Sequence, residues 1–271
     1  MVKFSAAIST TARSRMDRPY IDRLSKTLFR FLAQHYWRIE TAGLENLPTQ
    51  GRAILVGTHR GIIPWDAIMA LHLVVQVTGR VPRFLIQSGL LKFSPVAKVI
   101  TRLGGVLATQ ENAASVLEDN DLLGIFPEGV NGAFTRLRDA YRLHSFSRDN
   151  FVKIALRHRA PIIPFVTVGS AEVHPVFAQI KSRLWKRFAD WPCIPVSTFP
   201  LIPFPFPTKW HTIFLEAIHV ERQHRPEAAQ DAAIVKSISL EVRARMQAAM
   251  DDIIQRRRSI FHGSVFDQQQ E

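Results

Sequence analysis

The sequence has a single cysteine, Cys193, among its 271 residues. One cysteine excludes an internal disulfide and a zinc site built on several cysteines, and it is compatible with a reducing cytoplasm. The nine histidines other than His59 show no spacing typical of metal ligands. We therefore expect no metal site and a cytoplasmic location.

Long apolar runs are also missing, so no segment qualifies as a transmembrane helix. The longest uncharged run, 191–208, contains proline at six positions, which excludes a regular helix. We expect this segment to be an extended insertion that either lines an apolar groove or contacts lipid. The first sixteen residues lack the apolar core of a secretory signal. Their basic, acid-free composition fits a mobile arm or an organelle targeting segment.

Acidic residues are scarce relative to basic ones. The chain has 35 Lys and Arg against 23 Asp and Glu, a net charge of +12, and no acid lies between Asp66 and Glu111. This bias indicates an anionic partner, which could be a nucleic acid, an anionic membrane or a phosphorylated substrate. No recognised nucleic-acid motif accompanies the charge. We predict a peripheral association with an anionic membrane surface and no nucleic-acid partner.

The N-terminal region contains a candidate amphipathic helix over 20–38. Its apolar residues recur at helical spacing, and its basic residues fall mostly on the other side. This pattern fits either a surface helix packed on the domain or a helix lying in a membrane interface. The apolar positions are Ile21, Leu24, Leu28, Phe31 and Leu32.

Beyond residue 39, apolar strands and helices alternate. This alternation predicts a layered α/β fold with a central mixed sheet flanked by helices, plus the N-terminal amphipathic helix. We divide the chain into a basic arm and amphipathic helix (1–38), an α/β domain (39–225), and a C-terminal helix and tail (226–271). The expected strands are 52–57, 83–87, 106–108, 122–126 and 162–168, and the expected helices are 65–77, 90–103, 111–118, 151–159 and 226–258.

A histidine and an aspartate follow the first of these strands. The strand ends at Gly57, His59 lies just past its tip, and Asp66 comes seven positions later. In one continuous helix the two would be about 10 Å apart, but Gly61 and Pro64 indicate a loop that curls back before the helix starts. Asp66 can then accept the proton on one ring nitrogen of His59, which leaves the other nitrogen free as a base.

A second buried strand, 122–126, also ends in a polar turn. It is followed by Pro127, Glu128 and Gly129. Neighbouring strand ends that each deliver functional groups are the usual way in which an open α/β sheet builds a site. We therefore predict that Glu128 opens into the same cleft as His59.

Taken together, these stretches resemble the glycerolipid acyltransferases, which include the lysophosphatidic acid and glycerol-3-phosphate acyltransferases. The resemblance spans roughly 37–175 and rests on four blocks in order. One such motif is weak, whereas four with this spacing are specific. The blocks are Gly-Leu-Glu-Asn-Leu-Pro at 43–48, the stretch from His59 to Asp66, Phe-Pro-Glu-Gly at 126–129 and Ala-Pro-Ile-Ile-Pro at 160–164.

The resemblance implies transfer of a fatty acyl group from acyl-CoA or acyl carrier protein to a hydroxyl of a glycerolipid. The acceptor classes are lysophosphatidic acid, a lysophospholipid or an acylglycerol, and no cofactor is needed besides the acyl co-substrate. His59 would act as the general base and Asp66 would support it. No covalent acyl-enzyme is implied, in line with the absence of a Gly-x-Ser-x-Gly motif. The implied substrate-binding residues are Glu128, Gly129, Asn131, Gln110 and Arg136.

The sequence departs from the family pattern at three points. Six residues separate His59 from Asp66 where the family usually has four, which resembles a branch of monoacylglycerol- and diacylglycerol-acyltransferase-like proteins. Gln110 and Asn131 stand where the family commonly has arginines that bind the acceptor phosphate. Arg136 or Arg138 could supply that charge instead. The alternative function is a non-catalytic lipid-binding or membrane-tethering protein on the same fold, although the intact His59 and Asp66 argue against it.

Overall fold

A computed structural model describes residues 16–61, 63–91, 94–146, 149–181, 191 and 193–266. Its centre is a seven-stranded sheet in the order β1-β9-β6-β2-β5-β3-β4. All neighbouring pairs are parallel except β6 and β9, so the predicted mixed sheet is confirmed. The strands are β1 (Glu40–Ala42), β2 (Ala53–Gly57), β3 (Arg83–Ile86), β4 (Val106–Leu107), β5 (Leu122–Ile125), β6 (Ile162–Val168) and β9 (His211–Phe214).

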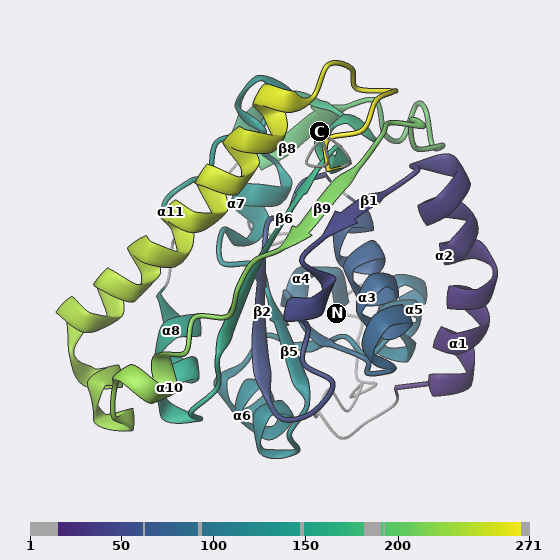
Figure 1. The fold of residues 1–271 in the computed structure, drawn as a ribbon. Coiled ribbons are helices and arrows are strands. Elements are labelled where there is room, and N and C mark those ends of the chain that lie inside the picture. The colour runs from purple at the N-terminus through teal and green to yellow at the C-terminus, as the bar shows by residue number, and fades with distance from the viewer. Residues whose placement is uncertain are drawn as a thin grey trace, which may run out of the picture.

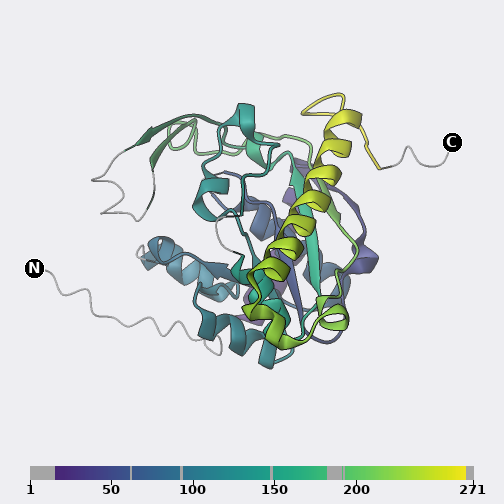
Figure 2. The ribbon, with the colours of Figure 1, turned by 90° about the vertical axis from the view of Figure 1, so that its left-hand side faces the viewer.

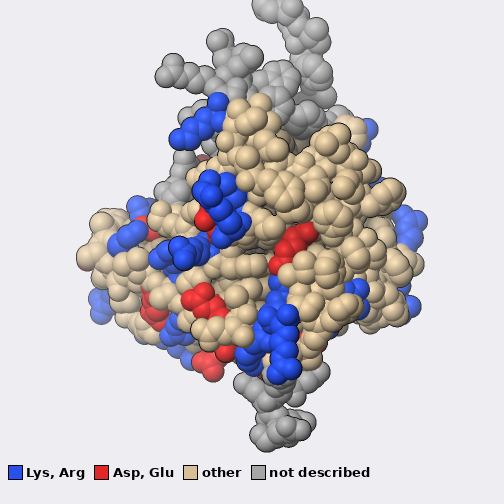
Figure 3. All heavy atoms as spheres, turned by 90° about the horizontal axis from the view of Figure 1, so that it is seen from above, with Lys and Arg blue, Asp and Glu red and all other residues tan. Residues whose placement is uncertain are grey.

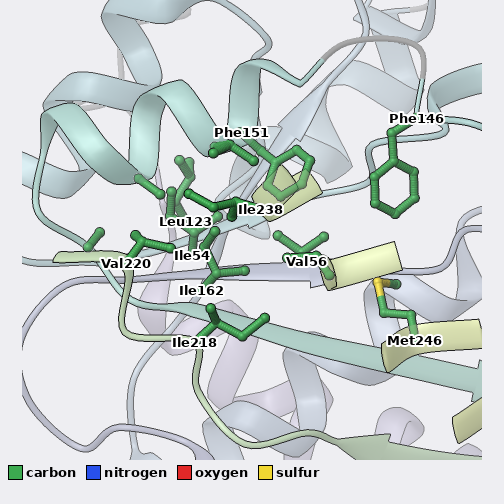
Figure 4. Close-up of a cluster of buried hydrophobic side chains, with 14 of the residues drawn as sticks. Ile54, Val56, Leu123, Phe146, Phe151, Ile162, Ile218, Val220, Ile238 and Met246 are labelled. Carbon is green, nitrogen blue, oxygen red and sulfur yellow. The ribbon is translucent and has the colours of Figure 1, made fainter. Parts of the chain in front are cut away.

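Helices cover both faces of this sheet (Figure 1). On one face, α6 (Gln110–Glu118), α8 (Asn150–Arg157) and α11 (Ala232–Arg256) share a buried core with β2, β5 and β6 (Figure 4). On the other face, α1 (Arg18–Lys26), α2 (Leu28–Phe31) and α3 (Trp65–Thr78) enclose a second core. The described residues also contain α4 (Ser88–Leu91), α5 (Ser94–Arg102), α7 (Gly129–Ala133) and α10 (Val220–Gln223).

The predicted N-terminal helix is broken at Thr27. Helices α1 and α2 meet there, and a π-helical turn, Leu32–Tyr36, follows. The break shifts the helical register, so that Phe29 is buried together with Ile21. Leu28 and Phe31, which were predicted for the apolar face, are 47% and 52% exposed. The apolar side of this region therefore packs on α3, as the first of the two interpretations expected.

The predicted C-terminal helix begins in a short 3-10 turn, Pro226–Gln230, and continues as α11. Asp231 caps α11 by accepting hydrogen bonds from the backbone N–H groups of Ala233 and Ile234. Val235 and Met246 are buried in the core that α11 shares with the sheet. Helix α11 packs on β6 of the main sheet. The division at residue 226 remains a prediction from the sequence alone.

The Pro-rich segment 191–208 contains one strand, β8 (Cys193–Ser197). It pairs antiparallel with β7 (Val176–Lys181) in a two-stranded ribbon apart from the main sheet. Figure 2 shows this ribbon projecting from the body of the molecule. Within the described part of the chain, no helix is both long and apolar enough to cross a membrane.

Two buried histidines make the stability of the fold depend on pH. Burial lowers the pKa of both His72 and His211 from 6.5 to about 4. Both are therefore neutral in the folded protein at neutral pH, while the unfolded chain binds protons below about pH 6.5. Since the unfolded state then binds more protons, the free energy of unfolding falls as the pH drops from about 6.5 toward 4.

Replacing His72 by leucine should remove its share of this acid sensitivity. Between about pH 7 and pH 5, the wild-type free energy of unfolding should fall by about 2 kcal/mol more than that of the variant. Urea denaturation at the two pH values measures the difference. His262→Leu, at an exposed histidine, is the matched control and should follow the wild type. Parallel losses in wild type and His72→Leu would show that His72 is not the titrating group.

Candidate active site

The candidate site begins where β2 ends. A Cβ atom at Gly57 would lie 2.1 Å from the ring of Phe165, so only glycine lets the strand pass this ring without displacing it. The next residue, Thr58, accepts a hydrogen bond through its Oγ1 from the backbone N–H of Thr167 on β6. The segment that carries His59 is therefore fixed to two strands of the sheet at their carboxyl ends.

His59 and Asp66 meet as their spacing predicted. Nδ1 of His59 lies 2.9 Å from Oδ1 and 3.1 Å from Oδ2 of Asp66. Gly61 adopts a φ of +93°, which turns the chain back on itself before α3 begins. Asp66 then lies in the first turn of α3, where the helix dipole favours a carboxylate.

The Asp66 carboxylate is held from several directions. It is 1% exposed and also accepts hydrogen bonds from the backbone N–H groups of Arg60, at 2.6 Å, and Ala67, at 2.8 Å. These bonds fix the position of the carboxylate, which accepts a hydrogen bond from Nδ1–H of His59. This pairing selects the tautomer in which Nδ1 carries the hydrogen and Nε2 has a free lone pair.

The second ring nitrogen of His59, Nε2, is not engaged by the described residues. The side chain is 15% exposed, and within the described residues its Nε2 has no hydrogen-bond partner. The ring of Phe126, just past the end of β5, lies 4.9 Å from the imidazole centroid and limits its rotation. Nε2 is thus a fixed and available proton acceptor at the edge of the sheet.

The sequence analysis missed Arg60. Its Nη1 donates to Oε2 of Glu128 at 2.6 Å and to the carbonyl of His59 at 2.8 Å, and both charged side chains are almost fully buried. Oε1 of Glu128 also accepts from the backbone N–H of His144. Glu128 is therefore bound to protein groups through both oxygens, and its side chain is 1% exposed. The prediction that it opens into a cleft beside His59 is wrong, and its contact with an acceptor stays a prediction. A lone arginine beside a histidine gives no sequence signal for such a pair.

A loop over 140–144 completes the surroundings of Arg60. The carbonyl of Ala140 accepts from Nε of Arg60 at 2.7 Å. Next to it, the hydroxyl of Tyr141 donates to Glu172, whose carboxylate pairs with Arg257 just past the end of α11. Burial and the nearby charge of Glu172 raise the pKa of Tyr141, so its hydroxyl stays protonated. Helix α11 thus supports the loop that holds Arg60.

Helix α7 packs directly on the His59 loop. A Cβ atom at Gly132 would lie 3.0 Å from the carbonyl oxygen of His59, and the carbonyl of Ala133 accepts from the backbone N–H of Gly61. Gly129 begins this helix with a φ of +57° and open space around it. Asn131 is exposed on the same helix. The structure therefore brings Gly129 and Asn131 onto the helix that borders His59.

The two candidate phosphate-binding arginines are engaged with an acid. Arg136 pairs with Asp139 at 2.9 Å, and Arg138 contacts the same carboxylate at 3.4 Å. Gln110 is exposed at the start of α6 and lines a hollow of about 240 Å³ with Arg157 and His158. This hollow shares no lining residue with the His59 loop, so the structure does not join Gln110 to the other predicted site residues.

Comparisons with known proteins agree with the motifs. A family model described as Acyltransferase matches residues 38–168. An uncharacterized protein of Mycobacterium leprae is 32% identical over 257 residues, which cover 91% of this chain and 68% of the relative. Phytyl ester synthase 2, chloroplastic, of Arabidopsis thaliana is 29% identical over 138 residues, covering 48% of this chain and 19% of that protein.

A solved structure shares the fold. The 1-acyl-sn-glycerophosphate acyltransferase PlsC from Thermotoga maritima is similar with a TM-score of 0.57 over 89% of this chain and 81% of that chain, at 20% sequence identity. Its likeness confirms the predicted α/β architecture. The family model covers both sequence blocks that meet at the Arg60–Glu128 pair. The resemblance found in the sequence is confirmed, and the chain belongs to the acyltransferase family.

Proposed function

We propose that the protein transfers a fatty acyl group from the thioester of acyl-CoA or acyl carrier protein to a hydroxyl of a lipid acceptor, with His59 as the general base. The observation that carries the proposal is the pairing of Nδ1 with Asp66 while Nε2 stays available. A base must have a lone pair within reach of the proton that it removes, and a partially exposed imidazole with a fixed tautomer meets this condition.

The reaction follows from this arrangement. Nε2 of His59 removes the proton of the acceptor hydroxyl while its oxygen attacks the thioester carbonyl carbon. The tetrahedral intermediate collapses, the carbon–sulfur bond breaks, and the imidazolium returns the proton to the departing thiolate. The products are an ester and a free thiol, and no acyl-enzyme is needed. Asp66 stabilises the imidazolium that forms between the two steps.

Mass spectrometry of the products tests this function. Purified protein is given oleoyl-CoA with a panel of acceptors that contains lysophosphatidic acid, a lysophospholipid, monoacylglycerol, diacylglycerol and a long-chain alcohol. We expect at least one acylated product that depends on the enzyme and on the thioester. Oleoyl-loaded acyl carrier protein should be run in parallel as donor. The absence of any ester product with both donors would favour the non-catalytic lipid-binding alternative.

The acceptor that best fits the described side chains is a neutral lipid hydroxyl. A phosphate dianion in a partly desolvated cleft requires fixed positive charge. Asn131 supplies none, Gln110 lines a separate hollow, and Arg136 and Arg138 already share Asp139. Two relatives are phytyl ester synthases, a name that denotes esters of an alcohol without a phosphate. We therefore propose an acylglycerol or a long-chain alcohol as the acceptor.

A competition assay separates neutral from phosphorylated acceptors. Monoacylglycerol and lysophosphatidic acid, matched in acyl chain, are offered together, and we expect the neutral lipid to be acylated at least as fast. Asn131→Arg, on the exposed side of α7, should shift the ratio toward lysophosphatidic acid because it restores a bidentate phosphate ligand. A strong wild-type preference for lysophosphatidic acid that Arg136→Ala abolishes would contradict the proposal.

A further inference from the structure

One face of the β7–β8 ribbon contacts the protein, and the other is turned away from it. On the covered face, Nε2 of Gln179 donates to the carbonyl of Phe134 at 2.6 Å, and Cys193 packs in a small core with Phe134. Along the strands, Gln179 pairs with Pro195, Ala178 with Val196, and Ile180 with Ile194. Because side chains alternate across a strand, the last two pairs lie on the face turned away from the protein.

This outward face is wholly apolar. It consists of Ala178, Ile180, Ile194 and Val196, of which Ile180 is 55% and Val196 40% exposed. Phe177, at the irregularity in the pairing, is 59% exposed. A sheet with one face on the core normally turns polar side chains to water, and an isolated two-stranded ribbon is only marginally stable there. The reversed polarity indicates that the outward face meets an apolar partner.

The loop after β8 extends the apolar surface. Leu201 is 89% and Phe204 78% exposed, which is more than any of the exposed apolar side chains of the ribbon itself. Both side chains belong to the segment that directly follows β8, and a group of exposed apolar side chains marks an interaction site more often than single exposed ones do. The ribbon and this loop together are called the ribbon surface below, defined by 177–180 and 194–204.

The charges around the ribbon surface identify the kind of partner. Neither 173–181 nor 193–215 contains Asp or Glu. Lys181, the last residue of β7, is exposed. Figure 3, which looks down on this end of the molecule, shows a broad area without charged side chains, with Lys, Arg and some Asp and Glu around it. An apolar surface flanked by cations fits the acyl region and anionic head groups of a bilayer.

The ribbon surface also lies next to the candidate site. Gln179 holds Phe134, which directly follows α7, and the carbonyl of Ala133 on α7 binds the backbone N–H of Gly61. Helix α5, with Val96 and Val99 44% and 45% exposed, projects on the same side of the molecule as the ribbon (Figure 2). A bilayer on this side would meet both the ribbon and α5, which belongs to the acid-free stretch between Asp66 and Glu111.

We propose that the ribbon surface docks on an anionic lipid bilayer and thereby places the His59 loop at the membrane surface. The proposal deepens the proposed function and rests on it in one respect, because a lipid acceptor is what the docked site would receive. Docking itself needs no turnover and can be measured without it.

Vesicle flotation of the full-length protein tests this docking. The vesicles are phosphatidylcholine alone or phosphatidylcholine mixed with phosphatidylglycerol. The wild type should bind the mixed vesicles more strongly, and added salt should weaken the binding. Ile180→Thr with Val196→Thr should lower the affinity for mixed vesicles by about tenfold or more, because two apolar side chains of the outward face no longer enter the bilayer. Threonine preserves the β-branched side chain that a strand favours.

Matched variants make the result decisive. Leu240→Ser removes an apolar side chain that is 51% exposed on α11 and should bind as the wild type does. His59→Ala should bind vesicles normally although it loses acyl transfer. Vesicle binding and acyl transfer are therefore measured independently, and a failure of docking can be told from a failure of the proposed function. Docking is overturned if the ribbon double variant floats like the wild type, or if Leu240→Ser loses as much. It is also overturned if sedimentation shows that the wild type is a dimer, and the double variant disrupts this dimer without weakening vesicle binding.

Discussion

Replacing His59 by alanine should lower the rate of acyl transfer by about 10²–10⁴-fold while the fold stays intact. The imidazole is 15% exposed, so its loss leaves no large cavity in the core. Asp66→Asn should cost a similar factor for a different reason. An amide at this position donates as well as accepts, and it no longer selects the tautomer with a free lone pair on Nε2.

The measurement is the initial rate of ester formation with saturating acyl donor, together with a thermal unfolding curve for each variant. His262→Ala, at an exposed histidine, is the control and should retain full activity. Asp66→Asn is also expected to lose some stability, because the buried carboxylate accepts two backbone N–H groups besides His59. Near-normal transfer by a well-folded His59→Ala protein would rule out His59 as the base.

The His59–Asp66 pair could be predicted because its determinants are local. A buried strand, a glycine with positive φ and a proline before the helix lie within ten residues of one another, and each restricts the backbone by itself. The sheet followed from the same kind of signal, since apolar strands alternate with helices along the chain. Such features need no knowledge of distant parts of the molecule.

Other features depend on contacts that the sequence does not reveal. Arg60 and Glu128 are 68 residues apart, and either could have pointed to solvent. The break at Thr27 changed which residues of the N-terminal region are buried, although the periodicity there favoured one continuous helix. The apolar outward face of the ribbon likewise became visible only when the pairing of β7 with β8 fixed which side of each strand faces α7.

The Arg60–Glu128 pair yields the largest expected change in stability. Both side chains are at most 2% exposed, and a buried charge that loses its partner is costly. Arg60→Met should lower the free energy of unfolding by about 3–5 kcal/mol, because it leaves the Glu128 carboxylate without its cation. Glu128→Leu should lower the free energy of unfolding by a similar amount, because the Arg60 guanidinium then stays buried with backbone carbonyls as its only acceptors.

The double variant distinguishes the ion pair from simple loss of packing. Arg60→Met with Glu128→Leu removes both charges and should recover most of the lost stability, because a buried pair contributes little net free energy compared with apolar side chains of similar volume. Activity should not recover. Nη1 of Arg60 also holds the carbonyl of His59 at 2.8 Å, and no methionine can replace that bond.

Urea denaturation of the four proteins gives the coupling free energy of the pair, and the acyl-transfer rate of the double variant gives its effect on the site. The control is the surface pair Arg245–Glu241, whose side chains are 46% and 42% exposed. Arg245→Met should cost no more than about 1 kcal/mol. If Arg60→Met costs no more than Arg245→Met, the pair does not hold the two motifs together. If the double variant regains full activity along with stability, Arg60 does not position His59.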